Sequence, residues 1–373
     1  MSASTAKIAV AFGGPSPEHD VSILTGLLTS HELARAGRAV SCLYWSKAGG
    51  WYLVEPTLEA DAFVDGVPRG AEALRLTAGD GGGFTTGTGR LGRARSLAFD
   101  VVVNCCHGGP GEDGTLQAAL DLAGIAYTGP NVAGAALGMD KLAFAGVADA
   151  AGLPVLPRRL VHAGTEDVGF GGPYIMKPRF GGSSIGIQVV ADLATAKAQL
   201  EVGPHFRRGA VVEPYRAELF DVNVAVRAWP ALALSAVERP LRTSSSGEIL
   251  GYHDKYVGGH GMASAPRELP AALGDRAAST VRRCALEVAR FADVRGVARI
   301  DFLCDGEDVY LNEVNTIPGS LAKYLWVDPP VPFIDLLDTM VDEAAARPAA
   351  RYSAAGADGT VLRGAGAIAA KLA

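Results

Sequence analysis

The chain has 373 residues, more than a single compact core accommodates, so we expect two or three domains. Its formal net charge of -6 gives no indication of a basic surface for nucleic acid. The sequence contains no run of about eighteen apolar residues, so we expect no membrane span. The start lacks the long apolar core of a secretory signal, and the five scattered cysteines form no CxxC pair, so we expect a cytoplasmic protein with reduced thiols.

Strand and helix patterns alternate through the first 130 residues. The predicted strands are residues 7–12, 39–45 and 99–106, and the predicted helices are residues 21–37 and 115–124. This alternation is typical of a parallel sheet, in which ligands bind beyond the carboxyl ends of the strands. Two polar loops, GGPSPEH with Glu18 and HGGPGEDG with His107, follow predicted strands. We therefore expect both loops at that edge of the sheet.

The pattern changes from about residue 131. Helical segments give way to several strands without regular crossover helices, then to a long amphipathic helix over residues 276–292. Two further strands follow, bridged by the turn sequence DGED. These features predict a mixed α+β region. The last segment, residues 346–373, is rich in Ala and Gly, and we expect a loosely packed tail with a short helix.

The two strands around DGED carry a candidate metal site. Asp301 lies on the first strand, and Glu313 and Asn315 in the sequence NEVN share one face of the second. Three oxygen ligands without His or Cys suit a hard cation such as Mg²⁺ or Mn²⁺. Solvated acids near a hairpin are the simpler alternative for this pattern taken alone.

A glycine-rich loop in IMKPRFGGSSIGI is a candidate phosphate site. Lys177 ends the strand before the loop, and Ser183 and Ser184 add hydroxyl donors to backbone N–H groups that glycine leaves accessible. The lysine precedes the glycines, so this is not a Walker sequence, and an ordinary hairpin is the alternative. Further on, Lys255 and Tyr256 in GYHDKYVGG lie in a polar loop that would serve either as a lid or as an exposed turn.

Four motifs in this order resemble the ATP-grasp superfamily and, within it, the D-alanine–D-alanine ligase family, over residues 6 to about 340. The motifs are GGPSPEHDVS, HGGPGEDGTLQ, KPRFGGSSIGI and RIDF…NEVNTIPG. The resemblance implies an α/β fold with an N-terminal Rossmann-like domain (1–134) and two ATP-grasp subdomains. These would be a central ATP-binding subdomain (135–225) and a C-terminal catalytic subdomain (226–345), followed by the tail (346–373).

The resemblance also implies roles for individual residues, matched motif by motif. The residues implied to bind ATP are Lys141, Lys177, Ser184, Glu213, Asp221 and Lys255, with Glu218 as the alternative to Asp221. Asp301, Glu313 and Asn315 would hold two Mg²⁺ ions, or Mn²⁺. Those implied to act in catalysis are Glu18, Ser183 and Tyr256, which close the lid and position the first amino acid, and Arg299 and Gly319, which stabilise an oxyanion. Those implied to contact substrates are His107, Ser320, Leu321 and Lys323.

The implied activity is ATP-dependent joining of a carboxylate to an amine through an acyl phosphate, with two D-alanines as substrates in cell-wall building. A relative that couples another amino acid or a specialised-metabolite carboxylate to a different amine is the alternative. Residues 320–326 (SLAKYLW) favour this alternative, because the family usually has a small hydroxyl-bearing segment there to hold the carboxylate of the acceptor. A nucleotide-binding protein without catalysis is a third possibility. The expected partners are small amino acids, with neither nucleic acid nor membrane, and a homodimer by analogy.

Overall fold

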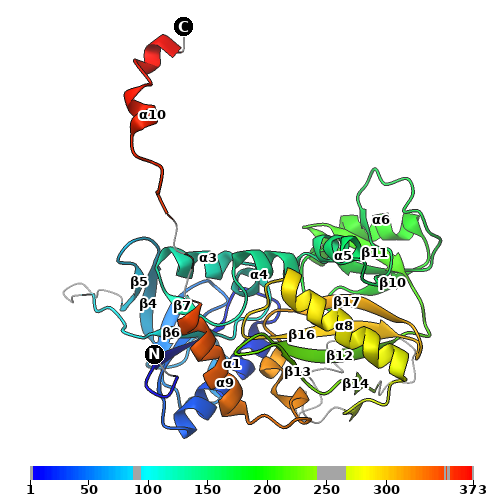
Figure 1. Cartoon of the computed structure of the whole chain (residues 1–373), viewed down its shortest axis with the longest axis horizontal. Coiled ribbons are helices and arrows are strands. Elements are labelled where there is room, and N and C mark those ends of the chain that lie inside the picture. The colour runs from blue at the N-terminus through cyan, green and yellow to red at the C-terminus, as the bar shows by residue number, and fades with distance from the viewer. Residues whose placement is uncertain (1–2, 87–93, 242–265, 348–349, 351–352, 372–373) are drawn as a thin grey trace.

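The computed structural model describes residues 3–86, 94–241, 266–347, 350 and 353–371. Lys255 and Tyr256 therefore lie outside the described residues. Figure 1 shows a body of sheets flanked by helices, from which the C-terminal tail projects.

A seven-stranded sheet forms the N-terminal part. Its strands, in spatial order, are β5 (Gly83–Thr86), β4 (Glu72–Thr77), β3 (Trp51–Val54), β2 (Ala39–Trp45), β1 (Lys7–Gly13), β6 (Val101–Asn104) and β7 (Ala126–Tyr127). The predicted parallel pairing is confirmed for β2, β1, β6 and β7. The other strands pair antiparallel. For β2 and β3 the reason is local, because the turn between them, closed by bonds between Ser46 and Gly50, is too short for a crossover.

Alternate side chains of β1 enter two different cores, as the strand period of two requires. Ile8 and Phe12 join one core, and Ala9 and Ala11 join the core on the opposite face. The helices of this half are α1 (His19–Arg35), the 3₁₀ turn η1 (Ala60–Phe63), α2 (Gly109–Glu112), α3 (Thr115–Leu122), α4 (Val132–Met139) and α5 (Lys141–Ala150). The two faces of the sheet are thus both buried, which explains why all four residues of β6 are buried and three of them are valines.

Two four-stranded sheets follow. The first has the order β10 (Gln188–Val190), β9 (Tyr174–Pro178), β11 (Ala210–Pro214), β8 (Arg159–Val161), with α6 (Leu193–Val202) and η2 (Pro204–Phe206) beside it. The second has the order β13 (Ala233–Leu234), β12 (Phe220–Arg227), β16 (Val297–Cys304), β17 (Val309–Asn315), and a small ribbon pairs β14 (Arg239–Pro240) with β15 (Arg267–Glu268). The predicted antiparallel pair across DGED is confirmed as β16 and β17.

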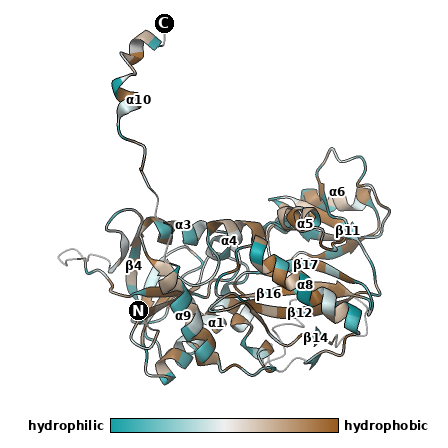
Figure 2. Ribbon diagram, in the orientation of Figure 1, coloured by the Kyte–Doolittle hydropathy of each residue, from teal (hydrophilic) through white to brown (hydrophobic). Residues whose placement is uncertain are grey.

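Helix α8 (Asp275–Phe291) covers the second of these sheets. Figure 2 shows hydrophobic and hydrophilic residues alternating around it. Val281, Cys284, Ala285 and Val288 recur at helical spacing and are buried in the core beneath the helix. All five cysteines of the chain are buried free thiols.

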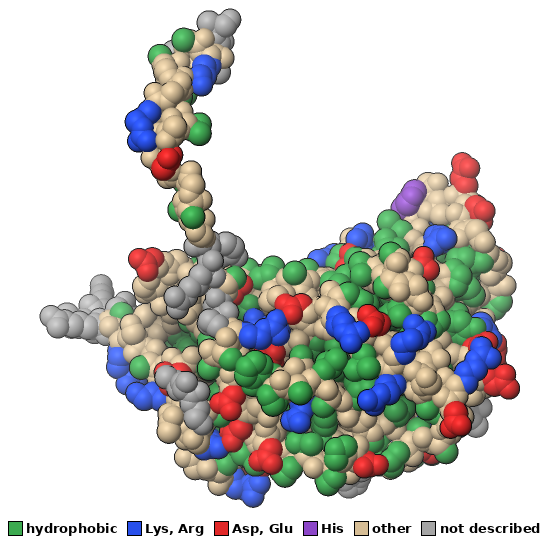
Figure 3. Space-filling view, viewed as in Figure 1, with side chains coloured by type: hydrophobic (Ala, Val, Ile, Leu, Met, Phe, Trp, Pro, Cys, Tyr) green, Lys and Arg blue, Asp and Glu red, His purple; other side chains and the backbone are tan. Residues whose placement is uncertain are grey.

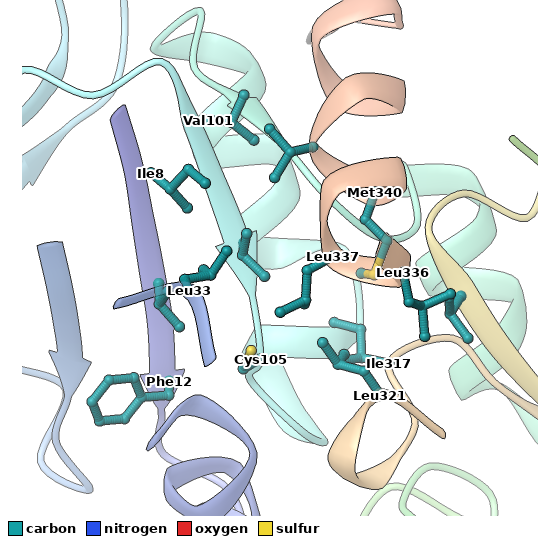
Figure 4. Packing of buried hydrophobic residues seen from close by; sticks show 14 of the residues in the cluster. Ile8, Phe12, Leu33, Val101, Cys105, Ile317, Leu321, Leu336, Leu337 and Met340 are labelled. Carbon is teal, nitrogen blue, oxygen red and sulfur yellow. The ribbon is translucent and has the colours of Figure 1, made fainter. Parts of the chain in front are cut away.

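The C-terminal segment joins the N-terminal core. Helix α9 (Phe333–Ala346) places Leu337 and Met340 in the same core as Ile8, and Ile317 and Leu321 of the preceding loop and 3₁₀ turn η4 (Gly319–Leu325) enter it as well (Figure 4). This shared core fixes the loop after β17 against the N-terminal sheet. The two polar loops of that sheet and the β16–β17 strands are thereby held around one space.

The tail leaves this body after Ala350. Residues 353–371 contain α10 (Thr360–Arg363) and η5 (Ile368–Lys371), and they stand away from the body in Figures 1 and 3. Val361 on α10 is 84% exposed. The division of the chain into four parts remains an interpretation. None of the helices in the described ranges is long and apolar enough to span a membrane.

Candidate active site

The two polar loops meet at the carboxyl edge of the seven-stranded sheet, as the sequence predicts. Ser16 Oγ donates to the carbonyl of His107 at 2.7 Å. Glu18, at the start of α1, points its carboxylate at the glycines of both loops: a Cβ added at Gly108 would lie 2.4 Å from Glu18 Oε2, and one at Gly182 would lie 2.9 Å from it. A side chain at either position would therefore displace the carboxylate, and Gly108 also has a positive φ of 64° that favours glycine.

The serine loop closes over Glu18 from the other side. Ser183 Oγ donates to Glu18 Oε1 in a short hydrogen bond. Ser183 and Ser184 take left-handed backbone conformations, with φ of 54° and 58°, which cost L-residues about 1 to 2 kcal/mol each. The structure thus brings together Glu18 and Ser183, two members of the predicted trio, and the third, Tyr256, lies outside the described residues.

His107 is held on both ring nitrogens. Nδ1 lies 2.7 Å from the carbonyl of Ile317 and Nε2 lies 2.8 Å from Thr25 Oγ1. Thr25 Oγ1 in turn accepts from the N–H of Ser320 at 3.1 Å. Burial lowers the pKa of His107 to about 4, and the charge of Arg299 acts in the same direction. This neutral histidine therefore links α1 to the loop after β17.

Glu112 also links the HGGPGEDG loop to the loop after β17. Its carboxylate accepts from Gly108 N at 2.8 Å, from Ile317 N at 3.0 Å and from Thr316 Oγ1 at 3.1 Å. Burial, together with the nearby charge of Glu18, raises the pKa of Glu112 to about 7. The sequence analysis gave Glu112 no site role, although it lies in the HGGPGEDG motif.

The predicted metal ligands gather on adjacent strands. Asp301 and Glu313 pair across β16 and β17, and Asn315 Nδ2 donates to Asp301 Oδ2 at 2.9 Å. Arg299 binds both oxygens of Asp301, each at 2.7 Å, and Lys141 Nζ lies 3.1 Å from Glu313 Oε2. The two cations hold the carboxylates in place around a shared polar space.

A β-bulge in β17 shapes this cluster. The pairing shifts after Asp301, so that Glu313 and Leu311 face consecutive residues of β16 and Asn312 is the extra residue. Asn312 and Glu313 are both only partly buried, which breaks the alternation of the strand. The strand pattern of the sequence does not predict Asn312 at the site, because a regular strand would turn it away from Glu313.

Lys177 belongs to a buried network around Glu213. Its Nζ donates to Glu213 Oε2 and to Asn312 Oδ1, both at 2.9 Å, and Arg158 Nε donates to Glu213 Oε1 at 2.5 Å. Burial alone would raise the pKa of Glu213, but Arg158 and Lys177 together hold it below its ordinary value. Arg158 also donates to the carbonyl of Lys141 at 2.6 Å. It thereby connects the two predicted phosphate-binding lysines, Lys141 directly and Lys177 through Glu213.

One cavity, partly open to solvent, connects these groups. The predicted residues that line it are Glu18, His107, Lys141, Ser183, Asp221, Arg299, Asp301, Glu313, Asn315 and Gly319. An adjoining cleft has an apolar part of its wall that includes Ile175 and Leu303. It is also lined by Lys177, Ser184, Asp221, Asp301 and Glu313. The acids and lysines thus lie where the two spaces meet.

Comparisons with known proteins show the family to which the chain belongs. The family models described as "D-ala D-ala ligase N-terminus" and "D-ala D-ala ligase C-terminus" match residues 7–130 and 136–342. The chain belongs to the D-Ala–D-Ala ligase family. A D-alanine–D-alanine ligase of Bradyrhizobium sp. (strain ORS 278) is 31% identical over 93% of this chain and 97% of its own length. One of Methylobacterium sp. (strain 4-46) is 33% identical over 91% of each chain.

Solved structures of ligases share the fold. The D-alanyl-alanine synthetase A of Vibrio cholerae superposes with a TM-score of 0.76 at 22% identity, over 92% of this chain and 99% of that one. The VanG D-Ala:D-Ser ligase of Enterococcus faecalis gives a TM-score of 0.71 at 23% identity, over the same shares. The predicted ATP-grasp architecture is therefore confirmed.

The segment after NTIPG, whose sequence departs from the ligase-family pattern, has an unusual backbone. Ser320, Leu321 and Ala322 are all left-handed, with φ near 50°. Leu321 is buried in the shared core, and Lys323 lies over the ring of Phe333, 5.1 Å from its centroid. The structure brings neither of these two predicted substrate contacts to the wall of the cavity.

Proposed function

We propose that this chain is an ATP-dependent ligase that joins two molecules of D-alanine through an acyl phosphate. The observation that carries the proposal is one cavity that is lined both by Glu18 and by the cluster of Asp301, Glu313 and Asn315. An amino acid bound by its ammonium at Glu18 can present its carboxylate toward the cluster. Family membership and the curated relatives support the same activity.

The adjoining cleft suits the nucleotide. Its apolar walls would hold the base, with Asp221 toward the ribose, while Lys141, Lys177 and Ser184 contact the phosphates. Glu213 acts in this proposal mainly by fixing Lys177, because its carboxylate is shared between Lys177 and Arg158. Lys255 completes the predicted set from the lid.

The oxygen donors of Asp301, Glu313 and Asn315 fit Mg²⁺. Among the described residues no three His, Cys, Asp or Glu side chains gather as a metal site, and two carboxylates with one amide match a hard cation that also keeps water and phosphate ligands. Two such ions would supply charge neutralisation during phosphoryl transfer. We assign these three side chains to hold them.

The chain's own groups then stabilise the second half-reaction. Arg299, fixed by two bonds to Asp301, and the N–H of Gly319 would bind the oxyanion formed when the acceptor amine attacks the acyl phosphate. Glu18 and Ser183 keep the first D-alanine in place until the C–N bond forms and phosphate leaves. The loop links through His107 and Glu112 keep Gly319 aligned with Glu18.

Release of phosphate from ATP and Mg²⁺ across a panel of amino acids tests the activity. We expect release with D-alanine alone, with one D-Ala–D-Ala formed for each phosphate. Release only when a different amine is added would favour the second candidate, a ligase with another acceptor, which the unusual segment at residues 320–326 supports. ATP binding without release in any mixture would contradict both.

A further inference from the structure

A cationic side chain on the wall of the main cavity has no role so far. Within the described ranges, the basic residues that line this cavity are Lys141, Arg267 and Arg299. Lys141 and Arg299 are held at the carboxylates of Glu313 and Asp301. Arg267 lies on another part of the wall, beside the apolar Pro240, Leu241 and Pro266.

The fold holds the guanidinium of Arg267 from two sides. Its Nη1 donates to Glu238 Oε1 at 2.8 Å, and Glu238 is 3% exposed and also accepts from Asn223 Nδ2 at 3.1 Å. The guanidinium lies over the ring of Tyr324, 4.8 Å from its centroid. Arginine has five N–H donors in a planar fork, a geometry that matches a carboxylate. Arg267 thus presents a positioned guanidinium at the cavity wall.

The groups expected to hold the acceptor's carboxylate are engaged elsewhere. The N–H of Ser320 donates to Thr25, and Leu321 is buried in the core. Lys323 lies over Phe333. Tyr324, from the same segment, lies behind the wall under Arg267 instead of lining the cavity. The segment at residues 320–326 therefore contributes to this wall by supporting an arginine from β15.

We propose that Arg267 binds the carboxylate of the acceptor amino acid and that Tyr324 positions its guanidinium. The proposal rests on the proposed function, which places the first amino acid at Glu18 and its carboxylate near Asp301. The amine of the acceptor must meet that carboxylate, so the acceptor's own negative group has to point away from Asp301 and Glu313. Among the basic residues that line the cavity in the described ranges, Arg267 is the one that is paired with neither of these acids, its ion pair being with Glu238.

A competition between two acceptors tests the proposal. The enzyme receives ATP, Mg²⁺, D-alanine and an equal concentration of D-alaninamide, which can accept but cannot be activated, and the ratio of D-Ala–D-Ala to D-Ala–D-alaninamide is measured. The wild-type enzyme should form more D-Ala–D-Ala than D-Ala–D-alaninamide. Arg267→Met should lower this ratio by about tenfold to a hundredfold, as expected for a lost charged hydrogen bond. The ratio is independent of ATP binding, donor binding and the folded fraction.

Two matched pairs of variants separate recognition from packing. Arg227 lies over the ring of Trp326 in the same way, 5.5 Å from its centroid, but does not line the cavity, so Arg227→Met should keep the wild-type ratio. Tyr324→Phe keeps the ring and should keep the ratio, whereas Tyr324→Leu should lower it. An unchanged ratio in Arg267→Met, or an equal fall in Arg227→Met, would overturn the proposal while the ligase activity stands. If wild type forms neither product, the proposed function itself fails.

Discussion

His107 shows how a single side chain in a substrate-binding motif can be committed to the fold. Both ring nitrogens are engaged, by Ile317 and by Thr25, and the ring is buried. Such a histidine must stay neutral in the folded state, because protonation would leave a buried charge. Its contribution is then to align Ser320 and Ile317 with α1, and it acts on substrates through that alignment.

This arrangement predicts a pH-dependent stability. Because the folded pKa of His107 lies near 4, below the unfolded value of 6.5, the unfolded chain binds more protons between these values, and stability is lost as pH falls through them. Between pH 7 and pH 5 wild type should lose about 2 kcal/mol more than His107→Gln. Urea unfolding of both proteins at the two pH values measures this difference. A difference between the proteins that does not change with pH would contradict the assignment.

Glu313 carries a sharper prediction about turnover. Glu313→Gln keeps the shape of the side chain but removes the charge that faces Lys141 and the proposed ions, so kcat should fall by about two to three orders of magnitude. Glu287→Gln is the matched control, because Glu287 forms an exposed pair with Arg290 on α8. Steady-state phosphate release measures both. Near wild-type activity in Glu313→Gln would remove Glu313 from the metal site.

At the scale of elements, the site depends on where one strand departs from regularity. The bulge at Asn312 turns two successive polar residues of β17 toward the site, and Arg158 fixes that bulge through its bond to the Asn312 carbonyl at 3.0 Å. The same guanidinium reaches β11 through Glu213 and the start of α5 through the Lys141 carbonyl. One buried arginine therefore holds β17, β11 and the start of α5 in place relative to one another.

Removing this arginine should weaken ATP binding more than D-alanine binding. Arg158→Met leaves Glu213 with Lys177 alone, and we expect at least a tenfold rise in KM for ATP and a loss of about 3 kcal/mol in stability. Arg159→Met is the control, since Arg159 is the exposed neighbour of Arg158 in the sequence and begins β8. Initial rates at varied ATP and urea unfolding provide the measurements. Unchanged ATP kinetics in Arg158→Met would contradict the positioning role.

These elements also show what the sequence could predict. Local patterns located β1, α1 and the β16–β17 pair, because period and turn chemistry are encoded within about twenty residues. Arg158 was missed because its partners Glu213 and Asn312 lie 55 and 154 residues away. No local pattern reports such a pairing.

Lys323 was expected in the acceptor pocket, whereas the structure places it over the ring of Phe333. The physical reason for this difference is the backbone of the preceding turn. Residues 320–322 turn the chain through three left-handed conformations without a glycine, each costing about 1 to 2 kcal/mol. Burial of Leu321 and Ala322 in the shared core stabilises the turn, which redirects the following residues. Only the tertiary packing contains that information.

At the scale of the whole molecule, the shared core makes the N-terminal sheet and the loop after β17 one unit. Ile8, Leu337 and Ile317 come from distant parts of the chain and pack together (Figure 4). Acidic and basic side chains are interspersed on the face shown in Figure 3, whereas the tail projects from the body and its α10 is exposed. The packing predicts that the body, and not the tail, determines stability and activity.

Truncation tests this division. Ending the chain at residue 352 removes α10 and η5 and should change the free energy of unfolding by no more than about 0.5 kcal/mol, with phosphate release unchanged. Ending it at residue 332 removes Leu336, Leu337 and Met340 from the core and should prevent folding. Loss of activity in the chain that ends at residue 352 would contradict this division and show that the tail contributes to the site.

The central claim is that the cavity activates the carboxylate of D-alanine by phosphorylation. D-alanine labelled with ¹⁸O in both carboxylate oxygens tests it directly, because breakdown of an acyl phosphate during amide formation leaves one substrate oxygen on the phosphate. Mass spectrometry of the phosphate released with ATP and Mg²⁺ should show one ¹⁸O for each D-Ala–D-Ala formed. Dipeptide formation with unlabelled phosphate, or no phosphate release with D-alanine, would contradict the account.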